Sequence, residues 1–403
     1  MTIAHETTRN RSFPALDGVR ALAAFGVVFT HVGFITGRSL RSDLLGPVLS
    51  RGDFGVTIFF LLSGFLLYRP FALNSMGVGP RPLVWAFFWR RALRILPALW
   101  VCVVITLSLI TTYRVRASDY LQYMLLIQTY DHHDYDPNLT QLWTLAVEIA
   151  FYALLPIFAA LMARGRQGPD AALRRQVVLL SVLVLVAFGF NVAQSRTSLT
   201  NSQALIWLPA YFDWFALGML LAVLSSVPAD CRAFFSSRQT LREWAGSPGT
   251  CFLVAGVIYL ISTLPLGIPR TLAPATFTQW TAQHYLYAAA AFFLLLPLVL
   301  GHGGAFGRVL GSAPASVLGN LSYSVYLWHV PLMFVFQREL GYREFHGHFV
   351  ELLLLTCASS LAVAGASWYW FERPILRYGT RPWRVRDTGS PIAATTIATR
   401  QSS

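Results

Sequence analysis

Residues 16–34 read LDGVRALAAFGVVFTHVGF, a stretch that is almost entirely small and apolar except for Asp17, Arg20 and His31. An apolar run of about 20 residues is long enough to cross the hydrocarbon core of a bilayer as one α-helix. A charged side chain near the middle of such a helix costs about 2.5–3.5 kcal/mol on insertion scales, so it should face a bundle interior and have a partner there. The stretch therefore predicts a spanning helix that packs within a larger membrane bundle.

The whole chain has the composition that such a bundle requires. Of its 403 residues, 55% are hydrophobic and 12% are charged, and the charges gather in short segments between apolar runs. This pattern is typical of a polytopic membrane protein whose charged segments are loops. The net charge of +13 follows from arginines in those loops, so we expect no nucleic-acid partner. The four cysteines show no ligand spacing, and we expect neither a disulfide framework nor a metal site.

Apolar windows near 20 residues predict ten spanning segments. These are 17–36, 54–73, 93–113, 141–163, 175–194, 205–225, 250–265, 281–301, 315–337 and 348–371. We therefore expect an all-α fold, a polytopic membrane helical bundle with about ten transmembrane helices. The bundle domain covers residues 16–378, between a short N-terminal segment at 1–15 and a polar tail at 379–403 that we expect to be disordered.

Arginine counts predict which side of the membrane each loop occupies. Ten spans place both termini on one side, and putting that side inside the cell gives 21 arginines on cytoplasmic segments and nine on the opposite loops. Basic residues favour the cytoplasmic side of a membrane. We therefore expect cytoplasmic N- and C-termini in a multi-pass protein of the cell membrane. Every basic residue is arginine and none is lysine, which favours a bacterial source with a GC-rich genome.

Arg20 and His31 share one face of the first span. They are 11 positions apart, so an ideal helix separates them by about 20° around its axis and about 16.5 Å along it. In the expected topology Arg20 lies near the cytoplasmic end, and His31 lies in the outer half of the membrane.

Two other spans carry an ionisable residue at the expected depth of His31. Glu148, in the fourth span, comes out about 10 Å below the outer surface, and His329, in the ninth span, comes to a similar depth. A single histidine in a membrane helix is as readily a hydrogen-bonded packing residue as a functional one. The coincidence of three such groups in one layer favours a site.

Arg90, Arg91 and Arg94 stand at the inner mouth of the third span, in the sequence WRRALRILP. Arg90 and Arg94 lie at i and i+4 on one helix face, where like charges repel by about 0.2–0.5 kcal/mol unless an anion compensates. That anion is either a lipid headgroup or a phosphate-rich cofactor in the cytoplasmic mouth. The two alternatives stay open on this pattern.

Ser63 lies in FFLLSGFLL, residues 59–67, which lacks the GxSxG pattern of a serine hydrolase. We expect Ser63 and Gly64 to serve close helix packing instead.

Five motifs in order resemble the acyltransferase 3 family of integral membrane O-acyltransferases. The first is LDGVRALAAFGVVFTH, which carries the arginine and the histidine of the first span. The others are FFLLSGFLL at 59–67, WRRALRILPALW at 89–100, LWTLAVE at 142–148 and SYSVYLWHVPL at 322–332. The resemblance extends from residue 16 to about residue 374, which is nearly the whole chain.

The resemblance implies an enzyme that transfers an acyl group, usually acetyl, from acyl-coenzyme A to a hydroxyl group. It implies no tightly bound cofactor, because acyl-coenzyme A is a co-substrate. The family's essential histidine maps onto His31 and its fourth-helix acid onto Glu148. The implied ligands of coenzyme A are Arg20, Arg90, Arg91 and Arg94.

Physical chemistry agrees with these roles. A neutral imidazole can take the proton of a hydroxyl as the oxygen attacks a thioester. Glu148 would fix the His31 tautomer, and the arginines would hold the coenzyme A phosphates. Further candidates for positioning the substrate are Trp143, Ser322, Tyr323 and His329. Ser322 or Tyr323 is a candidate oxyanion donor, with helix packing as an equal alternative.

We expect the acceptor to be a cell-envelope glycan or glycolipid, acylated directly across the membrane from a cytoplasmic donor. Members of the family often carry an appended extracellular hydrolase-like domain, and we expect none here, which argues against a relay within the chain. Two other functions stay open: acylation of a small secondary metabolite such as a macrolide, and transport or flipping of an envelope lipid or glycan.

Overall fold

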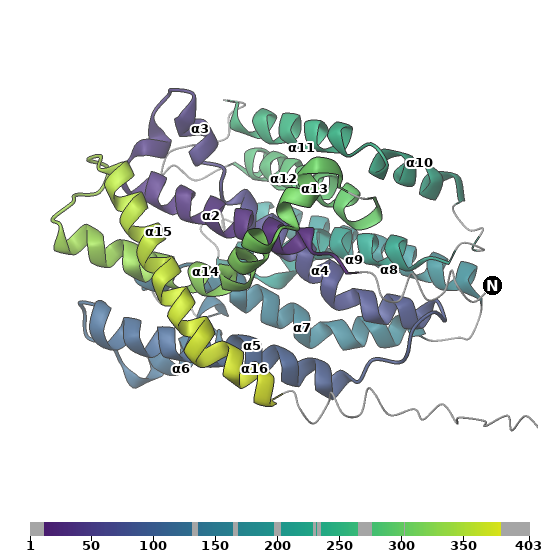
Figure 1. Ribbon diagram of the computed structural model, residues 1–403, viewed down its shortest axis with the longest axis horizontal. Coiled ribbons are helices and arrows are strands. Elements are labelled where there is room, and N and C mark those ends of the chain that lie inside the picture. Colours follow the sequence, from purple (N-terminus) through teal and green to yellow (C-terminus); the bar gives the residue numbers. More distant parts are fainter. Residues whose placement is uncertain are drawn as a thin grey trace, which may run out of the picture.

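The computed structural model describes residues 12–130, 136–163, 168–196, 203–228, 231, 235–264, 276–301 and 303–379. These residues form helices and no strand, so the predicted all-α fold is confirmed. The longer helices run roughly along the longest axis of the molecule (Figure 1). Most of the predicted N-terminal segment and all of the predicted tail after Gly379 lie outside the described residues.

Each predicted span coincides with a helix. These helices are α2 (Ala15–Ile35), α4 (Phe54–Ser75), α5 (Val84–Ile105), α7 (Leu142–Ala163), α8 (Pro169–Arg196), α9 (Phe212–Ser226), α11 (Pro248–Thr263), α12 (Phe277–Leu300), α14 (Ala313–Glu339) and α15 (Phe349–Ala366).

Shorter elements connect them. The α-helical ones are α3 (Leu45–Leu49), α6 (Ala117–Leu125), α10 (Phe235–Ala245), α13 (Gly304–Leu310) and α16 (Arg373–Gly379). Single turns of 3-10 helix are η1 (Arg38–Leu40), η3 (Gln128–Tyr130), η4 (Pro137–Leu139), η6 (Gln203–Ile206) and η7 (Leu208–Tyr211), and two π-helical turns, η2 (Thr106–Ile110) and η8 (Ser367–Glu372), extend α5 and α15.

The count of apolar spans is slightly lower than predicted. Among the described residues, eight helices are both long and apolar enough to cross a membrane, and a ninth forms if α10 and α11, which meet at 87°, are one broken span. Helix α14 has 27 residues and is long enough, but it does not join this set. Its middle carries many polar side chains, which are Asn320, Ser322, Tyr323, Ser324, Tyr326 and His329. Such residues are tolerated in a membrane helix when they face the bundle interior.

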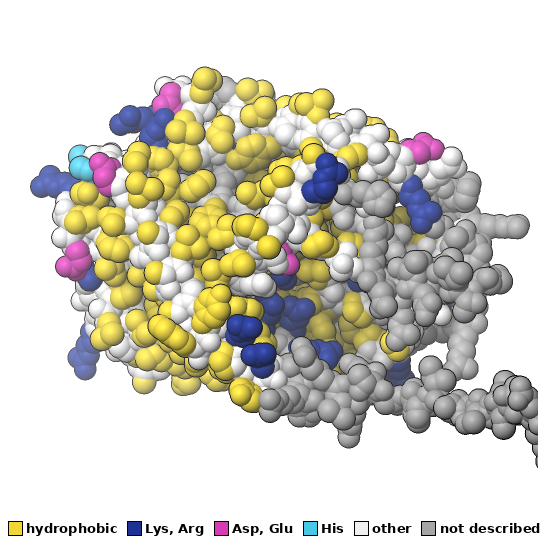
Figure 2. All heavy atoms as spheres, in the orientation of Figure 1, with side chains coloured by type: hydrophobic (Ala, Val, Ile, Leu, Met, Phe, Trp, Pro, Cys, Tyr) yellow, Lys and Arg dark blue, Asp and Glu magenta, His cyan; other side chains and the backbone are white. Residues whose placement is uncertain are grey.

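The outer surface is suited to lipid. Helix α8 exposes Val178, Val182, Leu185 and Phe188 on its outer side. In the described part of the face shown in Figure 2, hydrophobic side chains are widespread and charged side chains are fewer. An exposed apolar surface of this extent is covered by a bilayer in a multi-pass membrane protein.

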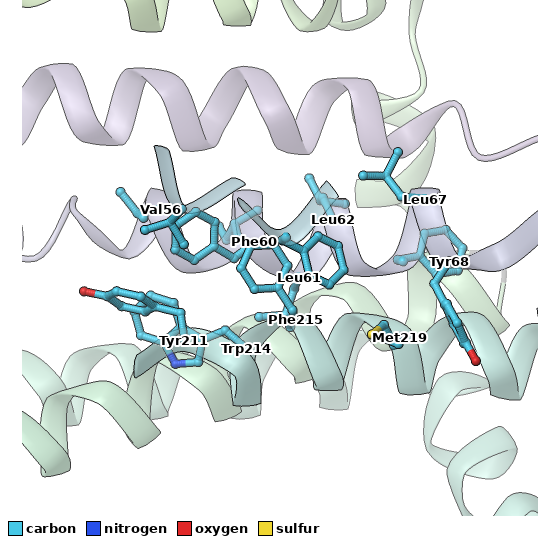
Figure 3. Close-up of a cluster of buried hydrophobic side chains, with 14 of the residues drawn as sticks. Val56, Phe60, Leu61, Leu62, Leu67, Tyr68, Tyr211, Trp214, Phe215 and Met219 are labelled. Carbon is cyan, nitrogen blue, oxygen red and sulfur yellow. The ribbon is translucent and has the colours of Figure 1, made fainter. Parts of the chain in front are cut away.

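Helices α4 and α9 form the centre of the bundle. The Phe215 ring on α9 stacks on Phe60 of α4, with ring centroids 4.8 Å apart (Figure 3). It also stacks on Phe151 of α7, with ring centroids 4.0 Å apart. A Cβ added at Gly218 would lie 2.0 Å from the Leu61 carbonyl oxygen, and one at Gly64 would lie 2.3 Å from the Phe215 carbonyl oxygen. The two backbones therefore touch, which confirms the close packing predicted at Gly64.

Candidate active site

Helices α2 and α14 run in the same direction and touch at two levels. Near their N-terminal ends, a Cβ on Gly319 would lie 2.4 Å from the Asp17 carbonyl oxygen, so no side chain larger than hydrogen fits there. Near their other ends, His31 of α2 contacts His329 of α14. The close backbone approach at Gly319 fixes the alignment that brings the two histidines together.

The two imidazoles form a direct hydrogen bond. His31 Nδ1 lies 2.8 Å from His329 Nε2, and His329 Nδ1 lies 2.7 Å from the Tyr326 carbonyl oxygen. The rings are nearly parallel, at 14°, with centroids 5.0 Å apart. His329 is fully buried and His31 is partly exposed. The two histidines, which were predicted to lie at a similar depth, are therefore in direct contact.

Helix α7 holds α14 in place beside this pair. Pro331 has no N–H, so it cannot bond the Leu327 carbonyl one turn earlier. The Gln141 side-chain amide donates to that carbonyl instead, at 2.8 Å. The Tyr326 hydroxyl lies 2.7 Å from the Thr144 hydroxyl. These bonds across the two helices steady the turn of α14 from which His329 projects.

A cavity of about 90 Å3 opens between α2, α4, α5, α7 and α14. Its polar lining residues are Arg20, Ser63, Arg91, Arg94, Thr144, Glu148, Tyr152, Ser322, Tyr323 and Tyr326. His31 and His329 do not line it. Tyr326 links the two parts of the site, because its side chain lines the cavity and its ring centroid lies 5.5 Å from that of His329.

Three guanidinium groups enter this cavity. Arg20 forms an ion pair with Asp17 at 3.3 Å, one turn earlier on α2. Neither Arg91 nor Arg94 forms an ion pair with another described residue, and Arg91 lies over the Tyr152 ring at 5.9 Å. Arg90 is exposed and outside the cavity. The prediction that Arg90 belongs with the other three is therefore corrected: α5 turns Arg91 and Arg94, at i and i+3, toward the interior.

Glu148 lies at the arginine end of the site and not against His31. One carboxylate oxygen, Oε1, accepts hydrogen bonds from the hydroxyls of Ser63 and Tyr152. Glu148 also lies within electrostatic range of Arg91. The expectation that Glu148 orients the His31 imidazole is therefore wrong for this structure, because His329 occupies the Nδ1 side of that ring.

The remaining predicted site residues have mainly structural contacts. Ser322 and Tyr323 line the cavity, but their hydroxyls donate to the backbone carbonyls of Gly319 and Ile95, at 2.7 Å and 2.8 Å. Their protons are thus engaged and do not point to an oxyanion. Trp143 lies outside the cavity lining, in an aromatic cluster with Phe60 and Tyr211.

Four polar residues of the cavity were not predicted as site residues: Ser63, Thr144, Tyr152 and Tyr326. Tyr152 follows Glu148 by four positions on α7, the spacing at which helical side chains meet, so the sequence carried a signal for that pair. Ser63 had no such signal, because its partner lies on another helix. Among the described residues, no group of three or more His, Cys, Asp and Glu side chains could hold a metal ion.

The fold and the site define a multi-pass membrane protein with a buried, arginine-lined cavity beside a pair of histidines. The chain belongs to the acyltransferase 3 family, whose model, described as an acyltransferase domain, matches residues 13–371. The family resemblance predicted from the motifs is confirmed.

Several curated bacterial proteins are similar to this chain over nearly its whole length. YrhL of Bacillus subtilis is 25% identical over 95% of this chain and 58% of its own length. The O-acetyltransferase OatA of Staphylococcus aureus is 24% identical over 92% of this chain and 58% of its own. The peptidoglycan O-acetyltransferase OatA of Listeria monocytogenes is 22% identical over 93% and 57%. The chain therefore spans less than two thirds of the length of these relatives. No solved structure matches it.

Proposed function

We propose that this protein transfers an acetyl group from acetyl-coenzyme A to a hydroxyl group of a cell-envelope glycan. Membership of the acyltransferase 3 family supports the type of reaction. The names of the relatives support acetyl as the group, and the name of the Listeria relative supports peptidoglycan as the class of acceptor.

The observation that carries the choice of donor is the charge of the cavity. The described lining residues carry three guanidinium groups, of which Arg20 is paired with Asp17, and a single carboxylate, that of Glu148. An excess of guanidinium groups inside a membrane bundle requires an anion. Guanidinium groups bind phosphates with paired, charge-assisted hydrogen bonds. Coenzyme A supplies these phosphates at one end of an extended molecule and the thioester at the other.

The histidine pair supplies the base. The acceptor hydroxyl oxygen attacks the thioester carbonyl carbon while His31 takes the hydroxyl proton. The carbon–sulfur bond then breaks, the ester forms, and His31 returns the proton to the coenzyme A sulfur. Tyr326 lies between the cavity and the histidines, so the thioester would approach His31 past this side chain.

The phosphate-binding end and the reacting end of the proposed site are separated along α2. Arg20 and His31 are about 16.5 Å apart along an ideal helix, which suits an anchored phosphate end and a distant thioester. With cytoplasmic termini, the arginines face the cytoplasm, where the donor is made, and His31 faces the outer half of the membrane, where a glycan acceptor enters.

Arginine substitutions test the donor site. We expect Arg91→Ala and Arg94→Ala each to weaken coenzyme A binding about 10-fold to 100-fold, because each removes charge-assisted hydrogen bonds worth about 1.5–3 kcal/mol. Arg90→Ala is the matched control on the same turn of α5, and it should change the affinity less than about twofold. Calorimetry with detergent-solubilised protein measures all three. Equal effects of the three substitutions, or no effect of any, would contradict the donor site and show that these arginines are ordinary loop charges.

A further inference from the structure

The hydrogen bonds of the histidine pair have a fixed direction. A carbonyl oxygen only accepts, so the His329 Nδ1 that lies 2.7 Å from the Tyr326 carbonyl oxygen must carry a hydrogen. A neutral imidazole has one N–H and one acceptor nitrogen. In neutral His329, Nε2 is therefore the acceptor.

The same reasoning then fixes the neighbouring ring. His31 Nδ1 lies 2.8 Å from His329 Nε2, and because that Nε2 accepts, His31 Nδ1 must donate. Neutral His31 consequently carries its hydrogen on Nδ1, and its Nε2 holds a free lone pair. The bond direction runs from His31 to His329 to the Tyr326 carbonyl.

The ring geometry supports a true hydrogen bond and not a face-to-face stack. The centroid separation of 5.0 Å exceeds the 2.8 Å between the nitrogens by about one centroid-to-nitrogen distance for each ring. With the rings only 14° from parallel, the N–H of one ring and the lone pair of the other point at each other within a shared plane. Full burial of His329 leaves no water to compete for its Nε2.

We propose that His329 is a positioning residue that holds His31 in the tautomer protonated on Nδ1, so that Nε2 is the base. The inference rests on the proposed function of His31 as base. The hydroxyl proton moves to Nε2 of His31, which becomes an imidazolium with two N–H groups. Its Nδ1–H continues to donate to neutral His329, and that bond becomes charge-assisted and stronger. Return of the proton to the coenzyme A sulfur restores the starting tautomer.

A neutral histidine thus takes the place that a carboxylate holds in a serine protease triad. An orienting group is important there because the wrong tautomer of the base is inactive. Helix α14 provides the support here. Its segment from Tyr326 to Pro331 supplies the carbonyl that fixes His329, and Thr144 of α7 and Gln141, which directly precedes α7, hold that segment.

Two substitutions at position 329 separate orientation from packing. In His329→Gln, the amide oxygen can still accept from His31 Nδ1, so we expect kcat to stay within about tenfold of wild type. In His329→Leu no acceptor remains, and we expect kcat to fall by about 10²- to 10⁴-fold with KM for acetyl-coenzyme A little changed. Thermal unfolding in detergent should show that both variants are folded.

Nitrogen-15 NMR of histidine-labelled protein reads the tautomer directly. We expect His31 to show a protonated Nδ1 and an unprotonated Nε2 in the wild type and in His329→Gln, and to change in His329→Leu. His284, which bonds Asp213 through Nε2 at 2.7 Å, is an internal reference that should not change.

Three results would overturn the proposal. They are an unchanged His31 tautomer in His329→Leu, equal loss of kcat in both folded variants, and an effect confined to KM. The NMR result does not depend on turnover. A wild-type protein without acetyl transfer would therefore contradict the proposed function and leave the tautomer assignment to be judged separately.

Discussion

The chemistry open to each ionisable side chain in this membrane bundle is set by the one or two atoms it bonds. His31 and Glu148 were predicted to form one catalytic pair, yet His31 bonds His329, and Glu148 bonds Ser63 and Tyr152. Both predicted residues lie in the candidate site, but at different ends of it. His31, the proposed base, belongs to the histidine pair, and the Glu148 carboxylate belongs to the arginine-lined cavity.

Glu148 gives a prediction at this scale. Because it is the one carboxylate among the described residues lining the cavity, Glu148→Gln should tighten coenzyme A binding by about twofold to tenfold, as loss of a repulsion of about 1 kcal/mol would do. The amide oxygen still accepts from Ser63 and Tyr152, so the variant should stay folded. In Glu148→Ala both hydroxyls lose their acceptor, and we expect the free energy of unfolding to fall by about 1–3 kcal/mol for each of them.

Calorimetry and thermal unfolding of the two variants check this prediction. Weaker coenzyme A binding by Glu148→Gln would mean that the carboxylate accepts a hydrogen bond from the donor, which would contradict the assigned role.

The sequence could not distinguish these pairings for physical reasons. An apolar run fixes where a helix lies along the chain, and that was enough to place Arg20 and His31 on one face of α2. The depth of a residue, counted from uncertain helix ends, is accurate only to about one turn of helix. Glu148 and Tyr152 are themselves one turn apart on α7, so the count cannot resolve their levels. Rotation of a helix about its axis depends on packing, which is why Arg90 could not be told from Arg91.

At the scale of elements, the contact of α4 with α9 is the one on which the bundle depends most. Gly218→Ala places a Cβ 2.0 Å from the Leu61 carbonyl oxygen, so the helices must move apart. We expect a loss of stability of about 1–3 kcal/mol, the usual cost of overpacking. Gly189→Ala on α8 is the control, because nothing lies within 4 Å of its Cβ.

Thermal unfolding in one detergent compares the two glycine variants. Gly189→Ala should be neutral or stabilising by up to about 1 kcal/mol, since alanine is the better helix former. Equal melting temperatures for the two variants would contradict the close contact of α4 and α9.

Helix positions were the most predictable feature at this scale, and span counts by composition were less so. Every predicted span is a helix, but α14 is too polar in its middle to count as an apolar span. The same polar residues that lower its hydropathy include Tyr326 and His329 of the site. The apolar-window scan of the sequence found this helix at 315–337, whereas the stricter hydropathy criterion leaves it out because of these polar residues.

The whole molecule is a bundle that separates a charged cavity from a histidine pair along one direction. In the proposed orientation the cavity faces the cytoplasm, and the histidines lie toward the outer half of the membrane. In the proposed function, this arrangement would bring a cytoplasmic thioester and an external hydroxyl together without moving either substrate across the full bilayer. A transporter would need no such base, and it would not consume acetyl-coenzyme A.

Acetyl transfer by oriented membrane vesicles tests this account most directly. Vesicles are prepared inverted or right side out from bacterial cells that produce the wild type or His31→Asn, and they are given labelled acetyl-coenzyme A, which does not cross a bilayer. We expect ester-linked label on envelope glycan only in inverted wild-type vesicles, and a rate at least about 100-fold lower for folded His31→Asn. Transfer by His31→Asn at the wild-type rate, or label only in right-side-out vesicles, would contradict the account.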